Sequence, residues 1–293
     1  MQFGTYFAYW EQEWNADYNF YCKKIASLGF DILEIAAASL AEMSDCQLEE
    51  LKHCAKESNV TLTACIGLPQ KYDVSSCDTE RRRNGISYLK KIICGMEKAG
   101  IHKLGGIIYS YWPYCYTEPF DKQQTRSISI QSMKEVADIA AEHQVQLMVE
   151  VTNRFEHFLL NTAEEAINYV NDIQKENVKI LLDCFHMNIE EDSIGEAIRQ
   201  TGSLLGHFHV GECNRKVPGK GHMPWNEIAA ALSDIDYQGA VVMEPFVRPG
   251  GTVGKDIKVW RDLSENADEA TLDRDIQSSL RFLKKTMLTQ REK

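Results

Sequence analysis

Four apolar runs in the second half of the chain each end in an acid or a histidine. The residues that end these runs are Glu150, Asp183, His209 and Glu244. A single acid at the end of a strand is often a helix cap, whereas four such residues at corresponding positions favour a set of ligands. Three carboxylates brought together stay ionised only if a cation lies between them. An oxygen-rich set with one imidazole suits Mn²⁺, Mg²⁺ or Co²⁺ better than a structural zinc.

A divalent cation at such a site would polarise a carbonyl oxygen and an adjacent hydroxyl, which makes the hydrogen on the neighbouring carbon removable. A carboxylate then acts as the general base, and its conjugate acid returns the proton. Glu150 and Glu244 are the candidates for this pair because they end well-separated runs. Return of the proton on the opposite face gives an epimer, whereas transfer to the adjacent carbon gives aldose–ketose isomerisation. The spacing leaves both outcomes open.

These residues need a frame that brings the ends of the four runs together. Short apolar runs alternate with amphipathic stretches along the chain, which predicts strands alternating with helices. The strands are expected at Phe3–Tyr9, Asp31–Ala36, Val60–Ile66, Lys103–Ser110, Gln146–Thr152, Val178–Asp183, Leu204–Val210 and Gly239–Glu244. The helices are expected at Tyr18–Leu28, Asp45–Glu57, Glu80–Ala99, Ile128–His143, Ala163–Gln174, Ser193–Thr201, Trp225–Leu232 and Leu272–Met287.

Eight such units predict an α/β fold, the eight-stranded parallel β/α (TIM) barrel, in which all strands end on the face that carries the active site. The rival is an open doubly wound sheet, which usually has a glycine-rich turn after its first strand. Here the first strand is followed by Ala8–Glu11, without such a turn. No linker-like segment interrupts the chain, so we expect residues 1–293 to form a single barrel domain with a C-terminal helical segment.

The composition argues against several classes of partner. The chain carries 43 acidic and 32 basic residues, a formal net charge of −11 that opposes binding to nucleic acid. No apolar stretch approaches the ~20 residues of a membrane span, and the N-terminus does not resemble a signal peptide. The nine cysteines are an odd number without a CxxC pair, which is typical of reduced thiols. We therefore expect a cytoplasmic protein with no nucleic-acid or membrane partner.

Several residues near the four run ends support either a functional or a structural interpretation. His207 shares a strand face with His209 but lies deeper, so we expect a hydrogen-bonded core group. His186 follows Asp183 by three residues, and its spacing suits a surface loop and a site residue equally. Arg154 and Glu156 are close enough in sequence to pair with each other.

Three further features each have a functional and a purely structural interpretation. Val217–Gly221 could hold a phosphate through its backbone N–H groups, but it lacks the P-loop spacing and a plain turn is favoured. Trp112, with Tyr109 and Tyr111, follows the fourth strand, where aromatic rings either wall a ligand or cap the core. Cys184 has no obvious base as a partner and is expected to be an inert apolar filler.

Longer motifs are spread along essentially the whole chain. They are Ala8–Trp14, Leu28–Glu34, Tyr109–Pro113, Met148–Glu150 with Asn153–Glu156, Phe185–Glu191, Gly206–His209 with Gly211–Arg215, Val217–Gly221, Met243–Val247 and Ile257–Asp262. With these motifs the sequence resembles the D-tagatose 3-epimerase and D-psicose (D-allulose) 3-epimerase family. The resemblance implies a xylose-isomerase-like barrel and a metal-dependent ketose 3-epimerase. Its substrates would be free ketohexoses, D-fructose and D-psicose or D-tagatose and D-sorbose, which react through a cis-enediolate.

The resemblance also implies roles for particular residues. The metal, Mn²⁺ or Co²⁺ with Mg²⁺ as a further option, would be held by Glu150, Asp183, His209 and Glu244, and the two glutamates would form the acid/base pair. Three residues would hold the hydroxyls near the reacting carbon, namely Glu156, His186 and Arg215. Two aromatic residues would lie near the far end of the sugar, namely Tyr6 and Trp112. A homodimer or homotetramer is expected.

The sequence departs from the family pattern in the segment Cys65–Ser75, which leaves the preferred ketose open. Two enzyme alternatives share the barrel: an aldose–ketose isomerase, and a sugar-phosphate 3-epimerase that uses the loop of Lys220. A barrel endonuclease acting on damaged DNA would need more ligands and a basic face, and the sequence offers neither. A non-catalytic sugar-binding module would keep its affinity without Glu150 or Glu244.

Overall fold

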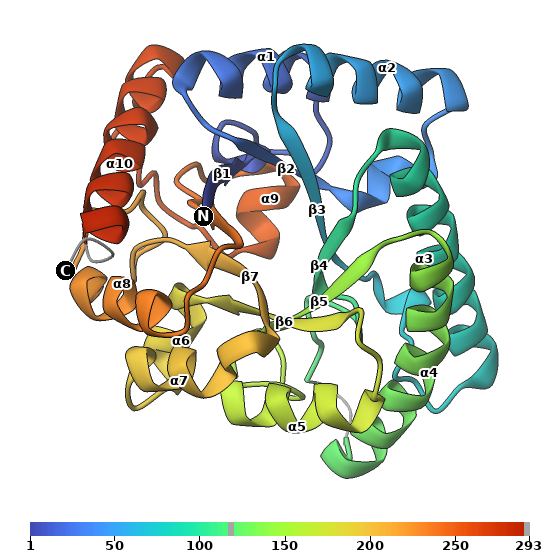
Figure 1. Ribbon diagram of the computed structural model, residues 1–293. Helices are drawn as coiled ribbons and strands as arrows, with labels where there is room; N and C mark the ends of the chain where they lie inside the picture. Colours follow the sequence, from blue (N-terminus) through green and yellow to red (C-terminus); the bar gives the residue numbers. More distant parts are fainter. Residues whose placement is uncertain (117–119, 290–293) are drawn as a thin grey trace.

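The computed structural model describes residues 1–116 and 120–289, and in them eight parallel strands close into a barrel (Figure 1). Each strand pairs with its neighbours in sequence, and the last strand pairs with the first. The strands are β1 (Gln2–Tyr6), β2 (Ile32–Ala36), β3 (Thr61–Gly67), β4 (Lys103–Ile107), β5 (Gln146–Val151), β6 (Val178–Asp183), β7 (Leu205–Val210) and β8 (Ala240–Met243). The predicted TIM barrel is confirmed.

Helices cover the outside of the barrel (Figure 1). The expected ones are α1 (Tyr18–Leu28), α2 (Asp45–Glu57), α3 (Thr79–Ala99), α4 (Lys122–Glu142), α5 (Ala163–Ile173), α7 (Ile194–Thr201), α8 (Trp225–Asp234) and α10 (Glu269–Thr289). Short helices that we did not expect are α6 (Cys184–Glu190), α9 (Gly251–Asp256), η1 (Phe7–Tyr9), η2 (Ala37–Ala41), η3 (Gln70–Tyr72) and η4 (Gly202–Leu204). Most of these short helices follow the carboxyl end of a strand, where they shape the rim of the barrel.

The first strand ends earlier than its apolar run predicts. We expected it to run over Phe3–Tyr9, but β1 ends at Tyr6 and the chain continues as η1. All three residues of η1 are buried, so the apolar run continues although the strand has ended. The fourth strand likewise ends at Ile107 instead of Ser110.

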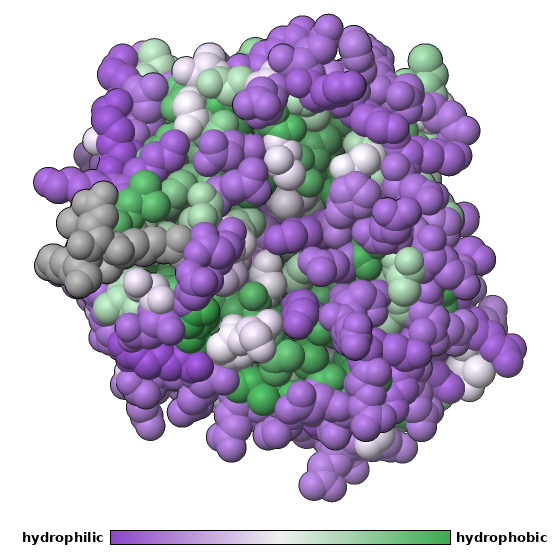
Figure 2. Space-filling view, in the orientation of Figure 1, coloured by the Kyte–Doolittle hydropathy of each residue, from purple (hydrophilic) through white to green (hydrophobic). Residues whose placement is uncertain are grey.

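The barrel interior is close-packed, and β4 contributes backbone instead of side chains at one point. A Cβ on Gly105 would lie 2.8 Å from Leu181 Cδ1, so glycine leaves space for the β6 side chain. The remaining apolar core lies between the barrel and its helices. The face seen in Figure 2 is mostly hydrophilic, and hydrophobic residues show mainly in its hollows. None of the helices in the described residues has the length and apolar character needed to cross a bilayer.

Hydrogen bonds join the segment after β1 to the segment after β8. The Val253 N–H donates to the Gln12 carbonyl (3.0 Å), and Arg248 Nη1 donates to the Trp10 carbonyl (2.7 Å). Farther along, Trp14 Nε1 donates to Asp256 Oδ2 (2.9 Å). The joint between the first and last strands therefore continues above the sheet, on the face where the strands end.

Candidate active site

The four acid and histidine residues from the strand ends lie together at the carboxyl face of the barrel. Each of Glu150, Asp183, His209 and Glu244 offers one donor atom, and these atoms all lie within 4.8 Å of one another. All four residues are buried. Asp183 pairs with His209 in the register of β6 and β7, and Glu244 directly follows β8.

A contact at one ring nitrogen of His209 directs the other ring nitrogen into this group. Its Nε2 lies 2.6 Å from Glu34 Oε1, within hydrogen-bonding distance. Its Nδ1 lies 3.8 Å from Glu150 Oε1 and 3.7 Å from Glu244 Oε2. This Nδ1 is buried and has no hydrogen-bond partner among the described residues. A buried nitrogen without a partner, facing carboxylates, fits a metal ligand.

The charges of the group also fit a divalent cation. Three carboxylates face one permanent positive charge, since Arg215 Nη1 lies 3.1 Å from both Asp183 Oδ2 and Glu244 Oε2. Burial raises the pKa of Glu244, and Glu150 adds to the rise. Burial would also raise the pKa of Asp183, but Arg215 and neighbouring histidines hold that pKa below its ordinary value. The balance of two uncompensated negative charges matches one divalent ion.

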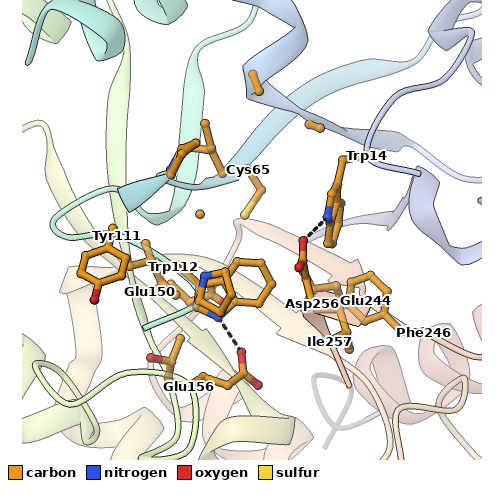
Figure 3. A pocket seen from close by; sticks show the side chains of 18 of the residues that line it. Trp14, Cys65, Tyr111, Trp112, Glu150, Glu156, Glu244, Phe246, Asp256 and Ile257 are labelled. Carbon is orange, nitrogen blue, oxygen red and sulfur yellow. Dashed lines mark hydrogen bonds between the residues drawn. The ribbon is translucent and has the colours of Figure 1, made fainter. Parts of the chain in front are cut away.

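A cavity of about 450 Å³ opens above the four residues, within the size range of small-molecule sites. Its polar end carries Glu150, Glu244 and Arg215. Aromatic and aliphatic side chains form the rest of the wall, among them Tyr6, Trp14, Ile66, Trp112, Phe246 and Ile257. Figure 3 shows Trp112 joined to Glu156 on one side and Trp14 joined to Asp256 on the other. The cavity thus combines a charged floor with aromatic walls, as a sugar requires.

The residues expected to contact substrate all line this cavity: Tyr6, Trp112, Glu156, His186 and Arg215. His186 belongs to α6 and is 2% exposed, so the surface-loop alternative is wrong. Its Nδ1 lies 2.7 Å from the Asn153 side-chain nitrogen, and its Nε2 lies 3.7 Å from Asp183 Oδ2. Trp112 Nε1 donates to Glu156 Oε2 (3.0 Å), which orients both side chains.

Arg215 is held by a turn with a left-handed backbone. Its φ is +63°, its N–H donates to the Glu212 carbonyl (2.9 Å), and its carbonyl accepts from Phe246 (3.0 Å). Its guanidinium lies 3.7 Å from the ring centre of Phe185. The backbone of this turn thereby fixes a charged side chain at the floor of the cavity.

The loop Val217–Gly221 folds around a buried carboxylate of the protein itself. The Gly219 N–H donates to Glu212 Oε1 (2.6 Å), and Trp225 Nε1 donates to the same oxygen (2.9 Å). Lys220 Nζ lies 2.5 Å from Asp275 Oδ2 at the surface. The favoured interpretation as a plain turn therefore holds, and the geometry offers no support for a phosphate cradle.

The structure contradicts the prediction for Arg154 and agrees with the prediction for Cys184. Arg154 pairs with Glu190 (2.7 Å), so the suggested pair with Glu156 is wrong. Cys184 is buried, its thiol contacts the Gly211 carbonyl, and burial holds its pKa well above the usual value, as an inert filler requires.

Glu34 is the residue that sequence reasoning missed. It lies 1% exposed in the middle of β2, where all five residues are buried. Burial would raise its pKa, but His207 and His209 hold that pKa well below its usual range. His207 is buried, as expected, and its Nε2 lies 3.1 Å from Glu34 Oε2, but neither ring nitrogen makes the expected hydrogen bond among the described residues. The available signal was one acid inside an otherwise apolar run, Ile32–Ala36.

Comparison with known proteins gives a consistent result. Residues 22–285 match a family model described as xylose isomerase-like TIM barrel. The chain is 53% identical to the D-psicose 3-epimerase of Ruminiclostridium cellulolyticum over 96% of both chains. It is 49% identical to the D-psicose 3-epimerase of Agrobacterium fabrum, over 96% of this chain and 98% of that one. A crystal structure of a D-psicose 3-epimerase in the presence of D-fructose superposes with a TM-score of 0.97 at 48% identity, covering 98% of this chain and 99% of the other.

Proposed function

The chain belongs to the xylose isomerase-like TIM barrel family, and we propose that within it the protein acts as a metal-dependent ketose 3-epimerase on free ketohexoses. The resemblance carried by its motifs is confirmed by relatives that are D-psicose 3-epimerases. The observation that carries the proposal is the buried cluster of Glu150, Asp183, His209 and Glu244, of which Glu150 and Glu244 line a cavity of about 450 Å³. We expect D-fructose and D-psicose as one substrate pair, and D-tagatose and D-sorbose as another.

The four residues of the cluster would hold one divalent cation. Mn²⁺ or Co²⁺ is expected, with Mg²⁺ as a further option, because three oxygen ligands and one imidazole nitrogen suit these ions. When bound, the cation would polarise the carbonyl and hydroxyl oxygens next to the reacting carbon and offset the negative charge that develops there. The unpartnered Nδ1 of His209 supports this assignment.

Glu150 and Glu244 are proposed as the acid/base pair at C3. They approach the cavity from β5 and from the end of β8, which lie apart in the ring of strands. One carboxylate removes the C3 proton, the sugar becomes a cis-enediolate, and the other carboxyl group returns a proton to the opposite face. General base catalysis of this kind contributes about 10²–10⁴ in rate.

The remaining cavity residues would hold the sugar in place. Glu156, His186 and Arg215 present charged or hydrogen-bonding atoms beside the acidic cluster, where they would contact the hydroxyls near C3. Tyr6 and Trp112 belong to the apolar wall, where they would pack against the far end of the sugar. Orienting contacts of this type place the reacting carbon between the two glutamates.

The first test is a substrate panel. Metal-stripped protein is incubated with D-fructose, D-psicose, D-tagatose and D-sorbose, with and without Mn²⁺ or Co²⁺, and the sugars are separated by chromatography. The proposal expects a C3 epimer that forms only with metal. An aldose product would favour the isomerase instead, and much faster turnover of phosphorylated ketoses would favour the sugar-phosphate epimerase. If no ketose changes its C3 configuration, the proposal is wrong.

The roles of the two glutamates are tested by Glu150→Gln and Glu244→Gln in deuterated water. Each variant should lose epimerisation by about 10²–10⁴-fold. At Mn²⁺ concentrations high enough to saturate each variant, each should still exchange the C3 hydrogen from one epimer but not from the other. Exchange from both epimers in both variants would contradict the division of roles. Glu190 forms an ion pair with Arg154 and does not line the cavity, so Glu190→Gln is the matched control and should keep wild-type turnover.

The proposal also covers the oligomeric state of the protein and its location in the cell. We expect a homodimer or homotetramer, which light scattering of the purified protein would test. We propose the cytoplasm as the location, because an odd number of cysteines without a CxxC pair is typical of reduced thiols.

A further inference from the structure

Glu34 contacts the proposed metal ligand His209 from the side opposite the cavity. We propose that Glu34 is a positioning residue, which fixes the tautomer and ring orientation that His209 needs to bind a cation. The inference rests on the metal site of the proposed function and adds a residue outside the cluster that would hold the ion. Both carboxylate oxygens of Glu34 make contacts that support this role.

The two oxygens of Glu34 have separate partners. Oε1 lies 2.6 Å from His209 Nε2. Oε2 accepts from Thr63 Oγ1 (2.8 Å) and lies 3.1 Å from His207 Nε2. Thr63 stands directly opposite Glu34 in the register of β2 and β3. Because Thr63 of β3 donates to Oε2 while His209 of β7 contacts Oε1, the carboxylate cannot rotate away from His209 without breaking the Thr63 hydrogen bond.

This contact selects one tautomer of His209. An ionised carboxylate only accepts hydrogen bonds, so in the neutral imidazole that a metal ligand requires, the one remaining hydrogen lies on Nε2. Nδ1 then carries the lone pair, and Nδ1 is the buried nitrogen that faces Glu150 and Glu244. A carboxylate behind a ligating histidine commonly orients the ring and raises its basicity. Glu34 is placed to do both.

Burying the Glu34 carboxylate among the apolar residues of β2 costs free energy, and a purely structural role does not explain that cost. Glu34 is flanked in β2 by Leu33 and Ile35, which are fully buried. A buried carboxylate destabilises a fold unless it is paired and hydrogen-bonded. Here every polar contact that the structure shows for the Glu34 side chain leads to Thr63, His207 or His209. The network therefore serves the histidine pair and not the packing of the barrel.

A second metal ion is the competing interpretation. Glu34, Cys65 and His209 also offer donor atoms within 4.8 Å of one another. The contact of 2.6 Å between His209 Nε2 and Glu34 Oε1 is a hydrogen-bond length. Two ligands of one ion, each about 2.0–2.2 Å from it, lie farther apart than that. The geometry favours the hydrogen bond, and the metal stoichiometry decides between the two.

The test is the Mn²⁺ affinity of the whole protein, measured by competition with a chelator. In Glu34→Gln the amide can donate as well as accept, so His209 is free to place its hydrogen on Nδ1. We expect the dissociation constant for Mn²⁺ to rise by about 10–100-fold. Asp31→Asn is the matched control, because Asp31 begins the same segment at the opposite end of the barrel and its carboxylate accepts from the Phe3 N–H (2.9 Å). Its affinity should equal that of the wild type.

Two further measurements separate positioning from stability. Thr63→Val leaves the Glu34 charge in place and should raise the dissociation constant by about 2–10-fold, the worth of one hydrogen bond. The visible absorption of the Co²⁺-loaded protein should change in Glu34→Gln, because the coordination of the ion changes with the orientation of His209. In the Asp31→Asn control the spectrum should be that of the wild type.

The outcomes distinguish this inference from the proposed function. If the wild type binds no divalent ion, the proposed function fails. If the wild type binds one ion and Glu34→Gln binds it equally well with the same Co²⁺ spectrum, the positioning role is wrong, even if the variant melts at a lower temperature. If the wild type binds two ions and loses one in Glu34→Gln, the second metal site replaces the inference.

Discussion

Removal of the cation should destabilise the folded chain, because the buried negative charges at its site would then lack a counterion. Glu150, Asp183 and Glu244 are buried with donor atoms within 4.8 Å, and Arg215 offsets one of their three charges. A ligand that binds only the folded state at 1,000 times its dissociation constant adds about 4 kcal/mol of stability. With an unfolding entropy of about 2.1 cal/mol/K per residue, each kcal/mol shifts the melting temperature of a 293-residue chain by about 1.6 °C. A chelator should therefore lower the melting temperature by about 6–7 °C relative to protein in Mn²⁺ at 1,000 times the dissociation constant.

The assay is thermal unfolding of the purified protein in chelator and at stepped Mn²⁺ concentrations, with the dissociation constant measured separately. The melting temperature should rise with the logarithm of the free ion concentration. Glu244→Gln removes one ligand and should lose most of the increment, whereas Glu190→Gln should keep it. Equal melting temperatures in chelator and in saturating Mn²⁺ would refute the reasoning.

The size of this increment should depend on pH in a defined direction. Without metal, burial raises the pKa of Glu244, so the folded state holds a proton that the unfolded state has lost. The stability of the metal-free protein therefore falls as pH rises through that elevated pKa. The cation needs the ionised carboxylate, so the increment from Mn²⁺ should grow from mildly acidic to mildly alkaline pH. The pKa of Asp183 is lowered, so Asp183 stays ionised and adds no slope there. An increment that shrinks with rising pH would contradict the assignment.

Three substitutions test other parts of the structure. Lys220→Ala should leave ketose turnover unchanged, because Lys220 pairs with Asp275 at the surface; a tenfold loss of the rate, of the order expected for a lost charged contact, would restore a substrate role for this loop. Glu212→Gln should cost about 1–3 kcal/mol in urea unfolding, because its carboxylate accepts from the amides of the loop that follows it; an unchanged free energy of unfolding would show that the loop stands without it. Gly67→Ala should raise KM with little effect on kcat, because the new Cβ would lie 2.6 Å from Trp112 Cε3 and displace the ring; an unchanged KM in initial-rate measurements would exclude the ring from binding.

The barrel could be predicted because its signal is repeated. Alternating apolar runs and amphipathic stretches recur along the chain, and α1 and α2 begin and end where the sequence predicts. The floor of the site could be predicted for a related reason, since a polar residue at the end of an apolar run stands out. Glu150, Asp183 and His209 were visible in this way before any contact was known.

What the sequence leaves open depends on contacts between distant segments. Glu34 is an acid inside a buried strand, and its role emerges only when β2 is seen opposite the histidines of β7. His186 lies in α6, a single short helix whose burial depends on the loop of Asn153. Arg154 pairs with Glu190 across two loops, which no spacing along the chain could indicate.

The joint between β1 and β8 has a consequence for the order of folding. These strands pair residues from the two ends of the sequence, such as Phe3 with Val241, so the joint carries the longest loop-closure entropy in the barrel. Contacts of this range form late in folding. Trp14 and Asp256 cross the same joint and line the cavity. The cavity is therefore completed only when the ring closes, and in refolding the fluorescence change of Trp14 should accompany the return of activity instead of preceding it.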